Sequence, residues 1–326
     1  FYRCYDFKSV QFAQNIKLQS IEKEAFSLSS ITSILIPRKV RQIGERCFQE
    51  CENLYSVKFE DKSEICLIDK YLFSFSWIDH IEIPSSVKEI KERSFSYCKN
   101  LKSIQLPNES KLLKIDVNAF FNSNLERINL PASVKKLREG WCSYASRLCH
   151  VSVSPKNEYY KYVDDKYIIG KTCNREGKFE RLEFARRDIE EAIIPSYIKY
   201  ISSYAFYECE ELKNVEFSTG SEIEYIGKET FSSTSIDNIE IPSSIKEIGE
   251  RTFYWCRNLK NVTIEDSTSI KTLPKEVFFY SSIEHLFIPE SIEKLEKGWC
   301  YCAPKLTNVL ISNKNKNFSI AIWETV

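Results

Sequence analysis

Two segments of this chain, IPSSVKEIKERSFSYCKNLKSIQL at residues 83–106 and IPSSIKEIGERTFYWCRNLKNVTI at residues 241–264, are nearly the same and lie 158 residues apart. The displacement also relates Trp141 to Trp299. Within each block the prolines recur at 47-residue steps, at Pro37, Pro84 and Pro131 and again at Pro195, Pro242 and Pro289. Intermediate copies of the pattern divide each step into units of 23–24 residues. A period this short indicates a tandem repeat fold.

Each unit follows one pattern. It begins with L-x-x-I-x-I/L, whose alternation predicts a short half-buried strand. A proline or polar turn follows, then a segment such as VKEI (87–90), and then an aromatic residue three positions before Cys or Ser. The strand pattern starts at Phe7, Ile31, Leu54, Ile78, Leu101, Leu125, Leu148, Ile189, Leu212, Ile236, Leu259, Ile283 and Leu306. One such unit cannot bury its own apolar face, so the pattern predicts a parallel solenoid of stacked neighbours.

The motif L-x-x-I-x-I-P-x-S-V-x-x-I-x-x-x-x-F-x-x-C resembles the BspA-like leucine-rich repeat of surface proteins from anaerobic bacteria and parasitic protists. Residues 179–209 resemble the long BspA-like surface antigens of trichomonad protists. The resemblance covers nearly the whole chain. It implies an α/β-type horseshoe of short parallel strands, with turns or short helical segments on the convex side. It also implies a protein displayed on or released from the cell surface and associated with adhesion.

One stretch breaks the period. Between residues 155 and 188, two strand-like runs, KYIIG and RLEFA, flank the turn-like TCNREGK, which predicts an inserted β-hairpin. We therefore expect a solenoid arc at 1–154, a hairpin island at 155–188 and a second arc at 189–326. The island is either a binding protrusion or a spacer. Both ends are expected to be cut inside the repeat array, which predicts some self-association through uncapped ends.

Charge and motif content argue against several function classes. The 46 Lys and Arg balance the 46 Asp and Glu, so neither nucleic acid nor an anionic membrane is an expected partner. No apolar run reaches the roughly 18 residues of a spanning helix, and membrane association would need segments outside this chain. No phosphate-binding loop, nucleophile elbow or HExxH motif occurs. His80, His150 and His285 share one repeat position on separate strands. We expect no enzyme and no cofactor.

The cysteines follow the repeat rather than a metal or disulfide pattern. Five of the twelve lie three residues after a repeat aromatic, and intervening repeats place Ser or Thr there. Coils about 4.8 Å apart leave cysteines of alternate coils about 10 Å apart, too far for a disulfide. The column is predicted to be free, buried and small, and no zinc-ligand spacing is present. Its members are Cys4, Ser29, Cys51, Ser76, Cys98, Ser123, Cys209, Thr234, Cys256 and Ser281.

The residue between the last two apolar positions of each strand is predicted to point outward on the concave face. This column is mostly polar. Its exposed apolar exceptions, Leu35, Ile193, Phe287 and Leu310, are either anchors for a partner or ordinary surface scatter. The candidate partner-binding residues on this face are Lys58, Glu82, Gln105, Asn129, Glu240, Thr263, His285, Phe287 and Leu310.

Three sequons, at Asn108, Asn261 and Asn317, are candidates for N-glycosylation if the chain passes through a secretory route. A glycan on Asn261 would obstruct the concave face. The first hypothesis for function is a cell-surface or secreted protein that binds a protein or glycoprotein ligand on host cells or matrix. The alternative is an intracellular scaffold that binds a protein partner through the same solenoid.

Overall fold

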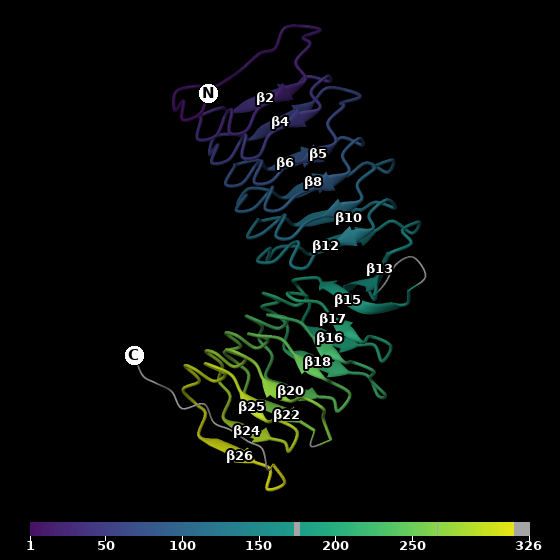
Figure 1. Ribbon diagram of the computed structural model, residues 1–326, viewed down its shortest axis with the longest axis vertical. Helices are drawn as coiled ribbons and strands as arrows, with labels where there is room; N and C mark the ends of the chain where they lie inside the picture. The colour runs from purple at the N-terminus through teal and green to yellow at the C-terminus, as the bar shows by residue number, and fades with distance from the viewer. Residues whose placement is uncertain (173–176, 266, 316–326) are drawn as a thin grey trace. The chain divides into compact units, whose positions relative to one another are not determined.

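The computed structural model describes residues 1–172, 177–265 and 267–315. They form two compact units, unit 1 (Phe1–Tyr162) and unit 2 (Val163–Val326). Each unit is a stack of coils, in which one coil contains a long strand, a turn, a short strand and a second turn (Figure 1). The result is a parallel-strand solenoid of leucine-rich repeats with twelve long strands, as the repeat pattern predicts.

The long strands of each unit form parallel sheets along one side of the coils. In unit 1 they are β2 (Ser33–Ile36), β4 (Ser56–Phe59), β6 (His80–Glu82), β8 (Ser103–Gln105), β10 (Arg127–Leu130) and β12 (His150–Val153). In unit 2 they are β16 (Glu191–Ile194), β18 (Asn214–Phe217), β20 (Asn238–Ile241), β22 (Asn261–Ile264), β24 (His285–Ile288) and β26 (Asn308–Ile311). The thirteenth expected copy, at Phe7, is not a strand, because its only ladder contact is an isolated bridge from Ser9 to Ser33.

Short strands form a second series of parallel ladders behind the first. In unit 1 they are β1 (Ser20–Ile21), β3 (Gln42–Ile43), β5 (Leu67–Ile68), β7 (Glu89–Ile90), β9 (Lys114–Ile115) and β11 (Lys136–Leu137). In unit 2 they are β17 (Tyr200–Ile201), β19 (Tyr225–Ile226), β21 (Glu247–Ile248), β23 (Thr272–Leu273) and β25 (Lys294–Leu295). The inward aliphatic residues of the long and short strands pack against each other. A single coil cannot bury them alone, so the core forms only when neighbouring coils stack.

A buried column of stacked phenylalanine rings fills the third side of the coils. Phe48, Phe73, Phe95 and Phe120 of unit 1 are fully buried, and successive ring centroids lie 5.3–5.6 Å apart. The equivalent rings of unit 2 are Phe206, Phe231, Phe253 and Phe278, with centroids 5.1–5.8 Å apart. Offset-stacked rings at this separation attract one another in addition to the apolar area that they bury.

The expected Cys/Ser column lies beside these phenylalanine rings. The Sγ of Cys98 donates to the carbonyl oxygen of Phe73 at 3.0 Å and lies 3.6 Å from the Oγ of Ser76 in the neighbouring coil. Cys51 and Cys256 repeat the arrangement, with Ser29 and Thr234 as neighbours. The eleven cysteines of the described part of the chain are free, and Cys173 lies outside it. The column is buried as predicted except at Cys4, which is exposed because it lies in the first coil.

Because these thiols are buried, we expect the folded protein to lose stability at alkaline pH. Burial raises the pKa of Cys51 and of Cys256 from the ordinary value of 9.0 to about 11. The folded state therefore keeps protons that the unfolded state releases. The contribution of these two thiols to the free energy of unfolding is full below about pH 9 and disappears as the pH rises toward 11. In urea titrations between about pH 7 and about pH 10.5, a Cys51→Ser/Cys256→Ser variant should lose less stability than the wild type. Equal losses in the two proteins would contradict this assignment.

The short helical segments expected on the convex side are absent from the described residues, where the corresponding segments are turns. The reason lies in the direction of the backbone hydrogen bonds. In one coil the N–H groups of Arg46, Phe48 and Glu50 donate to carbonyl oxygens of the next coil, at 2.8–3.0 Å, rather than four residues back. Arg46 and Glu50 have φ of 59° and 57°, a left-handed conformation that no right-handed helix can contain.

The segment that breaks the period contains two antiparallel strands, β14 (Tyr167–Lys171) and β15 (Phe179–Ala185). β15 also pairs in parallel with β17, so it serves as the short strand of the first coil in unit 2. Four of the five residues of β14 are buried. β13 (Tyr160–Val163) lies at the boundary between the units, inside the segment 155–188. These contacts integrate the two antiparallel strands into unit 2, whereas the division into two arcs and a separate island stays a prediction.

No helix capable of crossing a membrane is found among the described residues.

Candidate functional site

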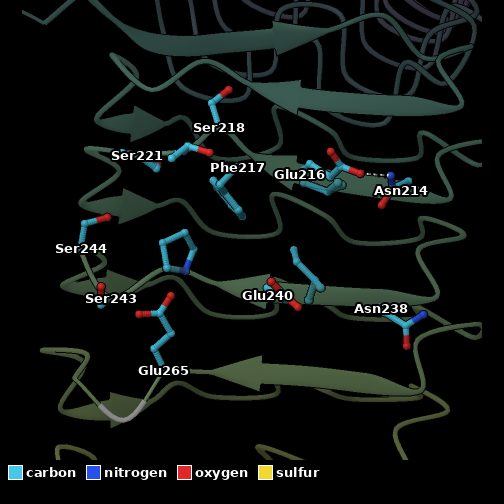
Figure 2. A pocket seen from close by; sticks show the side chains of 15 residues that line it. Asn214, Glu216, Phe217, Ser218, Ser221, Asn238, Glu240, Ser243, Ser244 and Glu265 are labelled. Atoms are coloured by element: carbon cyan, nitrogen blue, oxygen red, sulfur yellow. Dashed lines mark hydrogen bonds between the residues drawn. The ribbon is translucent and has the colours of Figure 1, made fainter.

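A polar groove of about 630 Å³ opens beside the long-strand sheet of unit 2 (Figure 2). Its floor is formed by β18, β20 and the turn that follows β20. The walls are the turns that follow β18 and β22. The residues that line this unit 2 groove are Asn214, Val215, Glu216, Phe217, Ser218, Thr219, Gly220, Ser221, Asn238, Ile239, Glu240, Pro242, Ser243, Ser244 and Glu265.

A second groove, of about 580 Å³, lies in unit 1 beside β4, β6 and β8. Its lining is displaced from that of the unit 2 groove by the same 158 residues that relate the sequence blocks, so that Glu82 corresponds to Glu240 and Lys58 to Glu216. The residues that line this unit 1 groove are Ser56, Val57, Lys58, Phe59, Glu60, Asp61, Lys62, Ser63, His80, Ile81, Glu82, Pro84, Ser85, Ser103, Gln105, Pro107 and Glu109.

Both grooves arise because long and short turns alternate from one coil to the next. The turn between β18 and β19 spans residues 218–224, whereas the turn between β20 and β21 spans only 242–246. The next turn, after β22, is long again. A short turn between two long ones leaves a recess in the edge of the stack, and Pro242 holds the short turn close to the sheet. The 23- and 24-residue units of the sequence therefore alternate for a structural reason.

The two grooves share a shape but differ in charge. The unit 2 groove is lined by Glu216, Glu240 and Glu265 together with hydroxyl groups, and its lining includes no Lys or Arg. The Nδ2 of Asn214 donates to the Oε1 of Glu216 at 2.8 Å (Figure 2). Asn214 and Asn238 are register partners, which places Glu216 and Glu240 on neighbouring strands. Like charges in that position repel each other, so the fold alone does not favour this pair.

The unit 1 groove instead mixes both signs of charge. Lys58 and Lys62 share the lining with four carboxylates, those of Glu60, Asp61, Glu82 and Glu109. A ligand that complements one groove is therefore not expected to complement the other equally well.

All nine candidate partner-binding residues lie on long strands, as the alternation predicts. Phe287 is half-buried and the other eight are exposed. The structure places Lys58, Glu82 and Gln105 in the unit 1 groove and Glu240 in the unit 2 groove. The remaining candidates line neither groove; they are Asn129, Thr263, His285, Phe287 and Leu310.

The sequence-based list missed the groove walls. The walls come from turn residues such as Ser218, Ser221 and Glu265, because strand alternation identifies only the floor. The alternating turn lengths were the available signal. Of the sequons, Asn108 is exposed on a long turn between Pro107 and Glu109 of the unit 1 groove. The Nδ2 of Asn261 donates to Asn238 at 2.6 Å, and Asn317 lies outside the described residues.

Catalytic chemistry finds little support in either groove. His80 in the unit 1 groove is exposed, and its Nδ1 lies 2.7 Å from the Oδ1 of Asp79. Ser56 and Ser103 line the same groove, and neither hydroxyl is hydrogen-bonded to the imidazole. The unit 2 groove is lined by neither His nor Cys. Within the described ranges, no group of three His, Cys, Asp or Glu side chains could hold a metal ion.

Solved structures with the same fold come from bacterial leucine-rich repeat proteins. The pneumococcal vaccine antigen PcpA is 24% identical and superposes with a TM-score of 0.72, over 91% of this chain and 68% of that one. A leucine-rich cell surface protein of Faecalibacterium prausnitzii is 21% identical, with a TM-score of 0.60 over 93% and 86% of the two chains. A leucine-rich repeat protein of Eubacterium ventriosum is 21% identical, with a TM-score of 0.66 over 94% and 76%. At these identities the likeness shows the fold.

No curated protein matches this chain. The profile of the BspA type leucine-rich repeat region, in contrast, matches in six copies over residues 1–90, 66–163 and 178–307. These copies cover most of the coils described above. The chain belongs to the BspA-type leucine-rich repeat family.

Proposed function

We propose that this chain is a non-enzymatic cell-surface protein that binds protein or glycoprotein partners through the grooves beside its long-strand sheets. The observation that carries the proposal is the occurrence of an equivalent groove in each 158-residue block, walled by the same alternation of turns. Two of the similar structures are those of a vaccine antigen and a cell surface protein, which supports the location.

The size and chemistry of the grooves suit a segment of polypeptide. Volumes near 600 Å³ fall within the range of ligand-binding pockets in proteins. Carboxylate, hydroxyl and amide groups line both, and such groups recognise the backbone and polar side chains of a partner by hydrogen bonds. Both floors belong to sheets whose inward residues are mostly buried, so little ordering of the floor is needed when a partner binds.

The proposal can be tested by measuring binding of the whole chain to a panel of immobilised matrix and cell-surface glycoproteins. Charge reversal in the grooves, by Glu82→Lys or Glu240→Lys, should weaken binding at least about tenfold for the groove that is used. Phe287→Ala tests the neighbouring part of the unit 2 sheet. Glu210→Lys, which reverses an exposed charge outside both grooves, is the matched control. Affinity unchanged by all three groove and sheet variants would refute the proposal.

Location needs a separate measurement. When intact source cells are treated with external protease, the proposal expects loss of this protein while a cytosolic marker survives. A chain that external protease does not reach would refute surface display and favour the intracellular scaffold.

A further inference from the structure

Five aromatic side chains, three of them exposed and two half-buried, form a contiguous cluster on the turns that follow the short strands of unit 2. We call this cluster, made of Tyr254, Trp255, Phe279, Tyr280 and Tyr301, the aromatic ladder of unit 2. Phe279 stacks on Tyr254 at 4.8 Å and on Tyr301 at 5.4 Å, and Trp255 contacts Tyr280 at 5.3 Å. Trp255, Tyr280 and Tyr301 are 39%, 44% and 54% exposed. The ladder therefore presents a large apolar surface to solvent.

The core does not require these rings. The buried column of Phe253 and Phe278 already fills the interior of the same turns. Trp255 and Tyr280 have φ of 59° and 54°, a left-handed backbone that costs a bulky side chain about 1–2 kcal/mol. Asn adopts this conformation more easily, and unit 1 has Asn122, with φ 53°, at the position equivalent to Tyr280. The fold explains the backbone conformation but not the exposed aromatic residues, which points to a function at the surface.

An unpaired cation accompanies the rings. The guanidinium of Arg257 lies 4.4 Å from the ring centroid of Trp255. Among the residues that the structure describes, no carboxylate forms an ion pair with Arg257, whose guanidinium contacts the Trp255 ring. Arg251 lies 5.7 Å from the centroid of Tyr254, but its charge is neutralised by Glu276 at 2.5 Å and Glu229 at 3.7 Å. Arg257 is therefore the cation available to a ligand on this ladder.

Unit 1 offers a natural comparison at the equivalent turns. Phe75, Tyr97, Phe121 and Tyr144 form a similar ladder there, with successive centroids 4.4, 5.4 and 4.8 Å apart. The residue equivalent to Arg257 is Lys99, and its Nζ donates to the Oδ1 of Asn122 at 2.5 Å. In unit 1 the equivalent of Arg257 is thus engaged by Asn122, while the guanidinium of Arg93 lies 5.2 Å from the ring centroid of Phe121.

We propose that the aromatic ladder of unit 2 binds an acidic peptide segment of a partner protein, in which an apolar side chain packs on the rings and a neighbouring carboxylate pairs with Arg257. Trp, Tyr and Arg are the residues that most often dominate the energy of protein interfaces. The edges of aromatic rings are electropositive, which favours the same carboxylate as the guanidinium does. A densely charged polyanion fits less well, because it would meet one available cation on a chain of zero net charge.

The surface is independent of the grooves. The ladder follows the short strands, whereas both grooves lie beside the long strands, and the two sets of residues do not overlap. The two proposals can therefore fail separately.

The experiment uses a phage-displayed library of random dodecapeptides selected on the whole chain, followed by affinity measurements with synthetic copies of the selected peptides. A Trp255→Asn/Tyr280→Asn variant removes the rings with a residue that tolerates the backbone, and its urea midpoint checks that unit 2 stays folded. We expect selected peptides with Asp or Glu next to an apolar residue, and binding to the variant weaker by about tenfold or more.

Two further variants test whether the peptide carboxylate pairs with Arg257. Arg257→Gln should weaken binding of the acidic peptide about fivefold or more but leave binding of its Glu→Gln copy unchanged. Glu240→Lys in the unit 2 groove should leave both affinities unchanged. The proposal is overturned if no selected peptide distinguishes wild type from the ring variant, if the selected peptides lack acidic residues, or if heparin binds at the ladder and the peptides do not.

Discussion

Replacing Phe231 by alanine should destabilise unit 2 by about 3–5 kcal/mol, the loss typical of a large ring removed from a packed interior. Phe231 is fully buried between Phe206 and Phe253, at centroid distances of 5.1 and 5.8 Å. The substitution interrupts both stacking contacts and leaves a cavity between two coils. Because each coil packs only against its neighbours, the stack cannot redistribute the loss over a larger core.

The measurement is urea unfolding of the whole chain followed by circular dichroism. Tyr280→Asn, which replaces an exposed ring two coils away from Phe231, is the control and should change stability by no more than about 0.5 kcal/mol. A loss below about 1 kcal/mol for Phe231→Ala would show that neighbouring coils collapse onto the vacated space, contrary to the prediction.

Replacing Asn157 by alanine should cost unit 1 about 2–4 kcal/mol through unsatisfied buried polar groups. The Nδ2 of this buried residue donates to the carbonyl oxygens of Pro131 and Val134 at 2.9 and 3.0 Å. Its Oδ1 accepts from the backbone N–H groups of Tyr159 and Tyr160 at 2.8 and 2.9 Å. All four hydrogen-bonding positions of the amide are therefore used: two fasten the chain to the turn of the preceding coil and two hold the local backbone.

Urea unfolding of the same kind tests this prediction. Asn129→Ala is the matched control, since that amide is exposed on β10 and should contribute little. Asn315, displaced by 158 residues, donates to Pro289 and Ile292 at 3.2 and 2.7 Å and should show a loss of the same origin in unit 2. Equal stabilities of Asn157→Ala and Asn129→Ala would show that the buried amide of Asn157 does not stabilise unit 1.

Repetition explains why so much of the fold could be predicted. The alternation in segments such as NVEF (214–217) and NIEI (238–241) predicts strands with alternate residues buried, and both strands occur with the expected register. The aromatic positions at Phe48 and Phe206 predict a buried column because they recur in phase with those strands. A position that appears a dozen times reports its environment far more reliably than a single residue does.

Features that depend on backbone conformation could not be predicted in this way. Left-handed residues such as Arg46, Glu50 and Trp255 are of types that carry no turn signal, so nothing in the pattern argued against the short helical segments that the resemblance implies. Asn157 occurs where the period breaks, and a single polar residue there is indistinguishable from a surface residue. The groove walls and the aromatic ladder likewise arise from turns, in which residues distant in sequence meet only after the coils have stacked.

The hydrogen bonds from one coil to the next also determine how this protein responds to mechanical force. Each coil is attached to its neighbour by a long strand of about four residues, a short strand of two and a row of turn amides. Pulled from one end, such a stack loses coils singly, because breaking one coil-to-coil contact leaves the others intact. Each detached coil of 23–24 residues releases on the order of 80 Å of extended chain. The protein thus lengthens under load in steps, while coils further along keep the grooves that they form.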